Sequence, residues 1–323
     1  VIGRNPFAAQ SFCAVVGAAT APLVFFCSRN IYGNLRVAKT TAIAIAVFPA
    51  FVIWSGQLLK DGLIIFLLVL AMTMVMQIQK KVGAPPLIVL GLSLLGILAL
   101  RFYIFYMVAV AVIGSFLVGL SDSQTSIARN LVILVLLGVS LTYLGVGKNA
   151  STDVATYGNL EKIQISRADL AKSAKSGYGD DVDVSTTEGA LSALPVGFAY
   201  LMFAPFPWQA ATIRQAITIP ETILWWSMMP LLLSGLIYTI KNRLRNAFPI
   251  LIFSLLLTLA YSIFQGNVGT AYRQRTQIQV FLFVLIGVGW TKRQEERENI
   301  RIIKDRGQKR RDDRLRQLGQ GRR

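Results

Sequence analysis

The sequence predicts an all-α, polytopic transmembrane helical bundle of about nine spans with one external loop domain. Of its 323 residues, 54% are hydrophobic and 15% are charged. The apolar residues form blocks close to the roughly 17–25 residues with which a helix crosses a hydrocarbon core. These blocks lack the polar–apolar alternation of barrel strands. Since only helices and closed barrels satisfy the backbone in lipid, helices are the expected spanning elements.

Nine apolar blocks carry this prediction: 7–27, 40–59, 62–78, 85–100, 102–120, 130–147, 222–240, 247–265 and 277–291. The stretch 85–120 would reach about 54 Å as one helix, which is too long for a single span. Arg101 lies near its middle, so we expect two short helices joined by a turn at 101–103.

Basic residues predict the orientation. The segment 292–323 holds 13 Lys/Arg and 6 Asp/Glu, and follows the last apolar block directly. Cytoplasmic loops of membrane proteins are enriched in Lys and Arg, so this tail is expected inside, with the breaks at 28–40, 80–81, 121–129 and 241–246. The expected location is a bacterial inner (plasma) membrane. The tail charge is expected to meet anionic membrane lipid, and no nucleic-acid partner is expected, because no aromatic RNA-reading motif accompanies it.

The predicted domains follow from this alternation of inner and outer segments along the chain. Spans 1–6 occupy 1–147, an external (periplasmic) loop domain occupies 148–221, spans 7–9 occupy 222–291, and the cytoplasmic tail is 292–323. The short apolar stretch 194–208 contains Pro205 and Pro207. If it crossed the membrane, the basic tail would lie on the outer side. It is therefore expected to be re-entrant or interfacial.

This topology gathers ionisable residues at the outer membrane edge, where they are costly and suggest function. "GNVGTAYRQR" (266–275) adds two glycines and hydrogen-bonding side chains to its arginines. Arginine matches phosphate oxygens with a planar fork. The predicted catalytic residues are Asp61 and Arg273, and the predicted substrate-binding residues are Lys60, Arg101, Asn267, Thr270, Tyr272 and Arg275. The alternative is that these arginines reach out to lipid headgroups, and that Lys60 and Asp61 form a solvated pair.

Two positions two residues apart do not share a helix face. Either 266–275 is a non-helical loop in which both arginines meet one ligand, or Arg273 and Arg275 have different roles. We expect at least one to point into a groove, with Arg273 favoured.

The chain has no histidine, so a general base must be a carboxylate. Asp61 is the first candidate, followed by Glu221 and the acidic cluster 180–188. That cluster lacks the spacing of a calcium loop. Ser185 and Glu188 fit a helix capping box instead. No metal site and no cofactor are predicted.

Four stretches carry a family resemblance: "VFPAFVIWSGQLLKDGLIIFLLVLAM", "LALRFYIFYMVAVAV", "PFPW" and "GNVGTAYRQR". They resemble bacterial polysaccharide polymerases and lipid-linked glycosyltransferases of the O-antigen and exopolysaccharide type. By this resemblance Lys60, Asp61, Arg101, Arg273 and Arg275 match the polar positions of the family. The chain departs from the family at Ala50, where serine is common, and in lacking the histidine of a ligase-type mechanism.

The predicted function is an integral-membrane glycosyltransferase or polysaccharide polymerase of the cell envelope. Its substrate would be a saccharide linked to polyprenyl phosphate or pyrophosphate, and its partners other members of a polysaccharide assembly system. The alternatives are a transporter or flippase of lipid-linked saccharides, which needs no base, and a non-catalytic membrane scaffold. No internal repeats favour the transporter.

Overall fold

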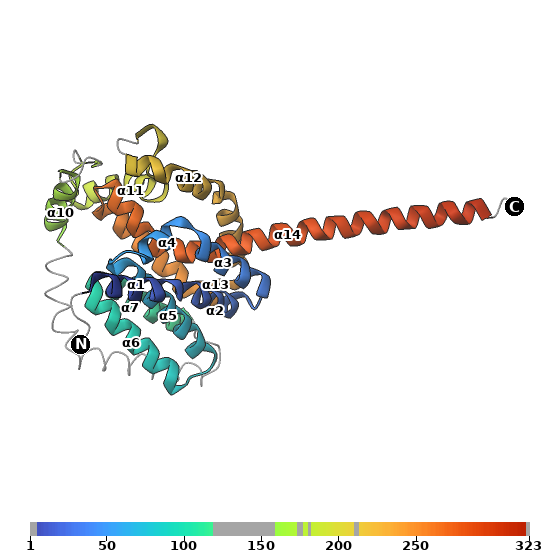
Figure 1. The fold of residues 1–323 in the computed structure, drawn as a ribbon, viewed down its shortest axis with the longest axis horizontal. Coiled ribbons are helices and arrows are strands. Elements are labelled where there is room, and N and C mark those ends of the chain that lie inside the picture. The colour runs from blue at the N-terminus through green and yellow to red at the C-terminus, as the bar shows by residue number, and fades with distance from the viewer. Residues whose placement is uncertain (1–4, 119–158, 173–176, 180–181, 210–212, 321–323) are drawn as a thin grey trace.

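The computed structural model describes residues 5–118, 159–172, 177–179, 182–209 and 213–320. In these ranges the chain is helical, and its extended pairing is one isolated bridge between Gly177 and Asn267. The predicted block 130–147 lies outside the described residues. The helices are α1 (Pro6–Ala18), α2 (Thr20–Tyr32), α3 (Leu35–Val47), α4 (Pro49–Ser55), α5 (Lys60–Lys80), α6 (Ala84–Leu100), α7 (Phe102–Val118), α10 (Leu160–Lys172), α11 (Thr187–Phe203), the 3₁₀ turn Pro207–Gln209, α12 (Ile213–Ser227), α13 (Met229–Phe264) and α14 (Val268–Gln320) (Figure 1).

Three helical stretches among the described residues are long and apolar enough to cross a membrane: Pro6–Tyr32, Lys60–Lys80 and Met229–Phe264. A fourth is counted if α3 and α4, bent by 58°, form one span. Helices α6 and α7 are apolar but shorter. The all-helical membrane architecture is thus confirmed in its class, and the number of nine spans stays a prediction.

The predicted turn inside 85–120 is confirmed. Helix α6 ends at Leu100, and Arg101 has an extended backbone (φ −151°, ψ 95°) before α7 begins at Phe102. A second break separates α3 from α4. There Phe48, the residue before Pro49, has an extended backbone (φ −72°, ψ 123° at Phe48). Proline disfavours the helical conformation of the residue before it, which explains this break.

Helix α13 doubles back near Arg243, whose backbone is not helical (φ −139°, ψ 19°). Before this point, the backbone of Gly235 packs directly against the Leu285 carbonyl, an approach that a side chain would block. After it, Phe253 lies against Phe281, with ring centroids 5.6 Å apart. Leu285 and Phe281, which are close together in α14, thus contact residues that are far apart in α13. The chain of α13 must therefore reverse its direction between Gly235 and Phe253. The reversal coincides with the basic break 241–246 between the predicted blocks 222–240 and 247–265.

Helix α14 is the central element and the longest, at 53 residues or about 80 Å. Its first half is buried among α3, α5 and α13, whereas the described side chains beyond Thr291 are mostly exposed. Figure 1 shows the second half projecting away from the bundle as a single rod.

Polar contacts join the basic breaks at one end of the bundle, called here the basic end (30–36, 80, 243–246 and 292–298). Lys80 Nζ donates to the Asn30 carbonyl at 2.8 Å, and Arg36 Nη1 pairs with Glu298 Oε2 at 2.8 Å. Such gathering is what the positive-inside pattern predicts. The side of the membrane on which this end lies stays a prediction.

The described parts of the predicted external domain contact the opposite end. Tyr178 N–H donates to the Gly266 carbonyl at 2.9 Å, beside the start of α14. A helix cap is present, but the predicted capping residues Ser185 and Glu188 are wrong: the N-cap of α11 is Thr186, whose Oγ1 accepts from Gly189 N–H at 3.1 Å. The Asp183 carboxylate accepts from Ser185 N–H at 2.8 Å, and this hydrogen bonding lowers the pKa of Asp183. These contacts make residues 183–189 the start of α11.

Candidate functional site

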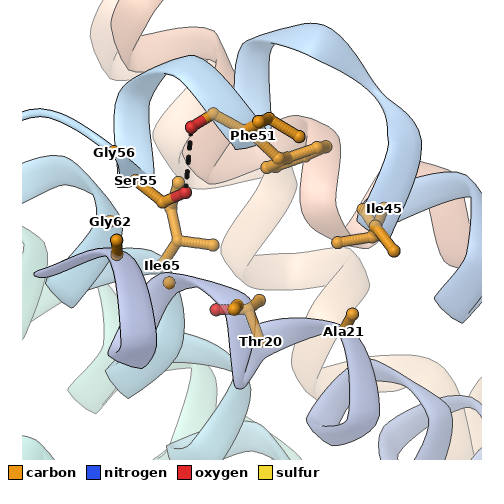
Figure 2. A pocket seen from close by; sticks show the side chains of 13 residues that line it. Thr20, Ala21, Ile45, Phe51, Ser55, Gly56, Gly62 and Ile65 are labelled. Carbon is orange, nitrogen blue, oxygen red and sulfur yellow. Dashed lines mark hydrogen bonds between the residues drawn. The ribbon is translucent and has the colours of Figure 1, made fainter. Parts of the chain in front are cut away.

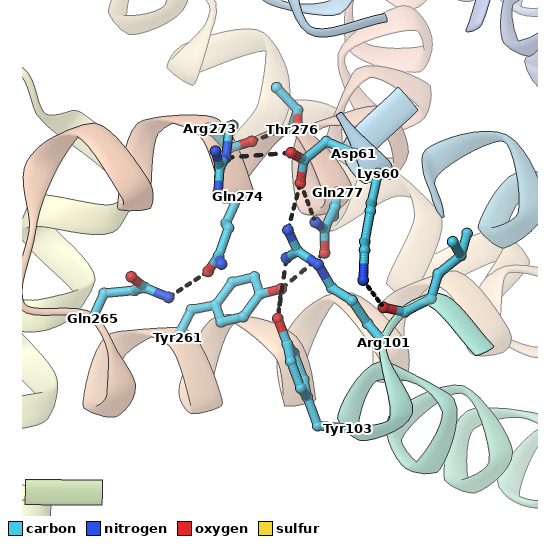
Figure 3. Close-up of polar contacts among 11 residues, drawn as sticks. Lys60, Asp61, Arg101, Tyr103, Tyr261, Gln265, Arg273, Gln274, Thr276 and Gln277 are labelled. Atoms are coloured by element: carbon cyan, nitrogen blue, oxygen red, sulfur yellow. Dashed lines mark hydrogen bonds and ion pairs between the residues drawn. The ribbon is translucent and has the colours of Figure 1, made fainter. Parts of the chain in front are cut away.

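Asp61 lies at the centre of the candidate site, in the first turn of α5, with a side chain only 1% exposed. Arg101 Nη2 donates to its Oδ1 at 2.8 Å, and Arg273 Nε lies 3.2 Å from its Oδ2. Gln277 Nε2 also donates to Oδ1, at 3.3 Å. Figure 3 shows these side chains converging on the carboxylate from α14 and from the α6–α7 break. Both carboxylate oxygens are therefore engaged by cations.

Three local features place these groups. The side chain of Arg101 crosses to α5 from the extended break between α6 and α7. Helices α5 and α7 both begin next to this ion pair, at Lys60 and Phe102. Helix N-termini carry partial positive charge, so these ends add to the positive potential of the arginines.

A ring of hydrogen bonds supports the ion pairs (Figure 3). Arg101 Nη1 donates to Tyr103 Oη at 3.0 Å, and Tyr261 Oη donates to Gln277 Oε1 at 2.8 Å. The two tyrosine hydroxyls lie 3.5 Å apart. Since the Tyr261 proton is committed to Gln277, Tyr103 is the donor between them. The hydrogen bonds therefore run in one direction, from Arg101 through Tyr103, Tyr261 and Gln277 to Asp61. Hydrogen bonds in such a chain polarise and strengthen one another.

Sequence reasoning missed Tyr103, Tyr261 and Gln277 as members of the site. Two of them had a local signal. Gln277 lies four residues after Arg273, which places both on one face of a helix. Tyr103 lies in the same "RFY" turn as Arg101. Tyr261 had no such signal, because only the packing of α13 on α14 brings it to Gln277.

The site carries an excess of positive charge. Lys60 Nζ lies 3.5 Å from the Leu100 carbonyl, next to Arg101. Arg101 and Arg273 pair with the Asp61 carboxylate, and Lys60 lies beside Arg101 at the Leu100 carbonyl; these three residues, called the cation set, and the single carboxylate together carry a formal charge of +2. The Arg101 side chain is 12% exposed and that of Arg273 is 30% exposed. An anion arriving from solvent can therefore reach the exposed Lys60 and the partly exposed Arg273 before it reaches Arg101.

Arg275 lies on a different face of α14, with no exposed surface. Its Nη1 donates to the carbonyls of Met202 and Ala204, at 2.9 Å each. Its guanidinium lies 5.0 Å from the Tyr272 ring centroid and 5.9 Å from that of Trp225. Arg275 thus fastens the end of α11 to α14. Of the four basic residues expected together, the structure joins Lys60, Arg101 and Arg273, and places Arg275 elsewhere.

The prediction of a loop over 266–275 is wrong in extent, because α14 already begins at Val268. Asn267 Oδ1 accepts from Gly269 N–H at 2.8 Å, and its carbonyl accepts from Ala271 N–H at 2.9 Å. This N-cap satisfies backbone donors that a helix start leaves free. The two arginines therefore follow the second alternative, a helix in which they have different roles.

The other two predicted binding residues also lie on this first part of α14. Tyr272 is 7% exposed and packs edge-on against Trp54, with centroids 6.2 Å apart. Thr270 is partly exposed. Tyr272 therefore has a packing role in this structure, and its role in substrate binding stays a prediction.

No family model matches the chain, and no curated protein matches it. Among solved structures, the fold is similar to the crystal structure of ArnT from Cupriavidus metallidurans bound to undecaprenyl phosphate. The sequence identity is 13% and the TM-score 0.49, over 88% of this chain and 45% of that chain. The chain thus spans less than half the length of that protein, and so distant a likeness carries no argument about activity.

Proposed function

We propose that the protein is a membrane glycosyltransferase or polysaccharide polymerase acting on saccharides linked to a lipid phosphate or pyrophosphate, at the outer membrane face. The observation that carries the proposal is the cation set around a buried carboxylate, with its residual charge of +2. A terminal phosphate or a diphosphate carries close to two negative charges at neutral pH. Charge balance therefore favours a donor linked through a diphosphate over one linked through a single phosphate, whose phosphodiester carries one negative charge.

The cation set would stabilise the leaving group. In glycosyl transfer from a diphosphate, the acceptor oxygen bonds to the anomeric carbon while the bond between that carbon and the phosphate oxygen breaks. The electron pair leaves with the diphosphate. Preorganised positive groups at the point of developing negative charge are usually the largest contribution to catalysis. Arg273, the more exposed arginine, would contact the phosphate directly, with Lys60 and Arg101 completing its binding.

Asp61 would act as the acceptor's base once substrate is bound. In the free protein both its oxygens face arginines. Phosphate oxygens would take over those guanidinium groups, and the released carboxylate would accept the acceptor hydroxyl proton. Asp61 therefore has two proposed roles, holding the arginines in place before binding and taking a proton during transfer.

Arg275, Asn267 and Tyr272 would position Arg273 rather than touch phosphate. Arg275 and Tyr272 fix the start of α14 to α11 and α4, and Asn267 caps the helix at its start. Thr270, in the partly exposed first turn of α14, is still proposed to bind the substrate.

A transporter or flippase of the same lipids is the second candidate. The observation that favours it is the interruption of one predicted span at Phe48, where α3 and α4 are bent by 58°. Broken helices recur in transporters, where they line the substrate path. A transporter would bind the same lipid but would form no new glycosidic bond.

The test is transfer by the purified, reconstituted protein supplied with a polyprenyl-diphosphate saccharide. We expect longer glycosides and released polyprenyl diphosphate, and about a tenfold or larger loss of turnover in Arg273→Lys, because lysine keeps the charge but loses the fork. Arg293→Lys, at the basic end, is the matched control. If Arg273→Lys turns over like the parent, the phosphate-clamp role is wrong. If lipid moves between leaflets with no glycoside formed, the protein is a transporter.

A further inference from the structure

A second feature at the site end of the bundle is an apolar pocket of about 370 Å³. That volume is within the roughly 300–1,000 Å³ usual for ligand pockets. Seven of its thirteen lining residues are alanine or glycine, and their small side chains leave the space open. Figure 2 shows Phe51, Ile45 and Ile65 facing the space from α4, α3 and α5. The hydroxyl of Ser55 is turned to the Val52 carbonyl, at 3.2 Å, so the lining offers little to a polar ligand.

Two interrupted helical segments border this pocket. Its lining includes residues on both sides of the α1–α2 junction at Ala19 and both sides of the 58° bend between α3 and α4. At membrane depth, irregular backbone is tolerated only where protein covers it or it lines a cavity. The bend at Pro49 turns α4 across the end of α3, and this leaves the space between α1, α3 and α5. The pocket thus results from breaks encoded in the sequence.

The pocket and the cation set share one wall, the first turn of α5. Asp61 faces Arg101 and Arg273, whereas Gly62 and Ile65 line the pocket. Successive helical residues are turned by 100°, so these positions occupy neighbouring faces of α5. At Gly62 a side chain would come within 3.0 Å of the Ser55 backbone, so glycine is needed for α4 to lie this close. A molecule with an anionic head and an apolar chain would meet both surfaces.

We propose that this pocket holds the hydrocarbon chain of a lipid phosphate, in the part next to the phosphate, while the cation set binds its head. The inference rests on the proposed function and extends it, since it assigns the chain of the substrate to α1, α3, α4 and α5. The occupant is a lipid monophosphate or diphosphate rather than a bulk phospholipid. A phosphodiester carries one negative charge, whereas the cation set has a residual charge of +2.

The experiment measures binding of a fluorescent polyprenyl monophosphate to the purified full chain in detergent. Ala46→Trp and Ala14→Trp fill the pocket from two helices. Their matched controls are Val47→Trp and Val15→Trp, neighbouring residues that are 69% and 70% exposed and do not line it. Isopentenyl monophosphate serves as a competitor with a head and almost no chain, and dioleoyl phosphatidylglycerol as a phosphodiester competitor. Size-exclusion elution of each variant checks its folding.

We expect about a tenfold weaker affinity for the long-chain probe in both filling variants, because the added side chain keeps about two methylenes of the probe from being buried. Competition by isopentenyl monophosphate should be unchanged in them, and phosphatidylglycerol should compete poorly. Arg273→Ala should weaken the binding of both monophosphates.

If the filling variants bind the probe like their controls while Arg273→Ala does not, the pocket inference is wrong and the proposed function stands. If Arg273→Ala binds both monophosphates like the parent, the proposed function fails. Equal competition by phosphatidylglycerol would contradict the proposed occupant, and would indicate that the pocket holds ordinary membrane phospholipid.

Discussion

Two ion pairs at opposite ends of the bundle have the same N–O distance, 2.8 Å, and differ in everything around them. At the basic end, the Arg36 and Glu298 side chains are 57% and 52% exposed. At the site end, the Arg101 and Asp61 side chains are 12% and 1% exposed. Exposed pairs contribute little to stability, because water and salt screen them.

A buried pair is also a poor source of stability, because removing two charges from water offsets most of their attraction. Asp61 meets two arginines and a glutamine, whereas apolar side chains of similar size would fill the same space at less cost. The comparison therefore teaches that the pair at the site end is better explained by a ligand than by folding. At the basic end, the exposed ion pair is explained by charges that remain in contact with water.

The largest expected effect concerns the two ends themselves. On a background without Cys13 and Cys27, single cysteines replacing Lys172 and Lys309 should react with an impermeant thiol reagent from opposite sides of sealed vesicles. Both positions are exposed, so accessibility in detergent is the control. Labelling of both from one side would show that the predicted topology is wrong.

The next effect is at Asp61. Asp61→Asn keeps the size of the side chain but leaves Arg101 and Arg273 without a counter-charge. We expect turnover to fall by at least about 100-fold, with binding of polyprenyl monophosphate retained or tightened, because the transition state loses its base and the phosphate loses a competitor. Enzymatic turnover and probe binding are measured on the same preparation. Unchanged turnover would remove Asp61 from the mechanism.

A smaller effect is expected at Arg275. Lysine cannot keep the geometry with which the guanidinium bridges two carbonyls and packs on Tyr272. Arg275→Lys should lower the free energy of unfolding by about 1–3 kcal/mol, the usual cost of leaving buried polar groups unpaired. The melting temperature of the purified protein reports this loss. Affinity for isopentenyl monophosphate should stay within about twofold of the parent, and a large loss of affinity without loss of stability would return Arg275 to the binding site.

The smallest effect is expected at the basic end. Arg36→Gln breaks the exposed pair with Glu298 and should change neither melting temperature nor turnover measurably, at low or at moderate salt. The paired control is Arg101→Gln, which removes one partner of the buried pair and should lower both. Equal behaviour of the two variants would show that burial does not distinguish the two ends.

Several features of this protein could be predicted from local sequence. Apolar block length predicts helices, and Arg101 and the basic run 241–246 mark interruptions that the structure contains. The break at Pro49, inside the block 40–59 that was expected to be one span, was not predicted. The gathering of Lys60, Asp61, Arg101 and Arg273 at one end follows from counting spans and placing charges. These predictions succeed because burying a charge or a break in an apolar segment is costly wherever it occurs, so its position along the chain is informative by itself.

Tertiary structure decided what the sequence left open. The stretch 266–275 has glycines typical of a loop, yet Asn267 caps a helix that α13 and α11 then bury. Arg275 finds its partners in Met202 and Ala204, and Gln277 finds Asp61 across 216 positions of sequence. A polar side chain in an apolar interior must be hydrogen-bonded, but which distant group satisfies it depends on how the helices pack. The division of roles between Arg273 and Arg275 therefore belongs to the packing of α14, and the sequence determined only that both would be costly to bury.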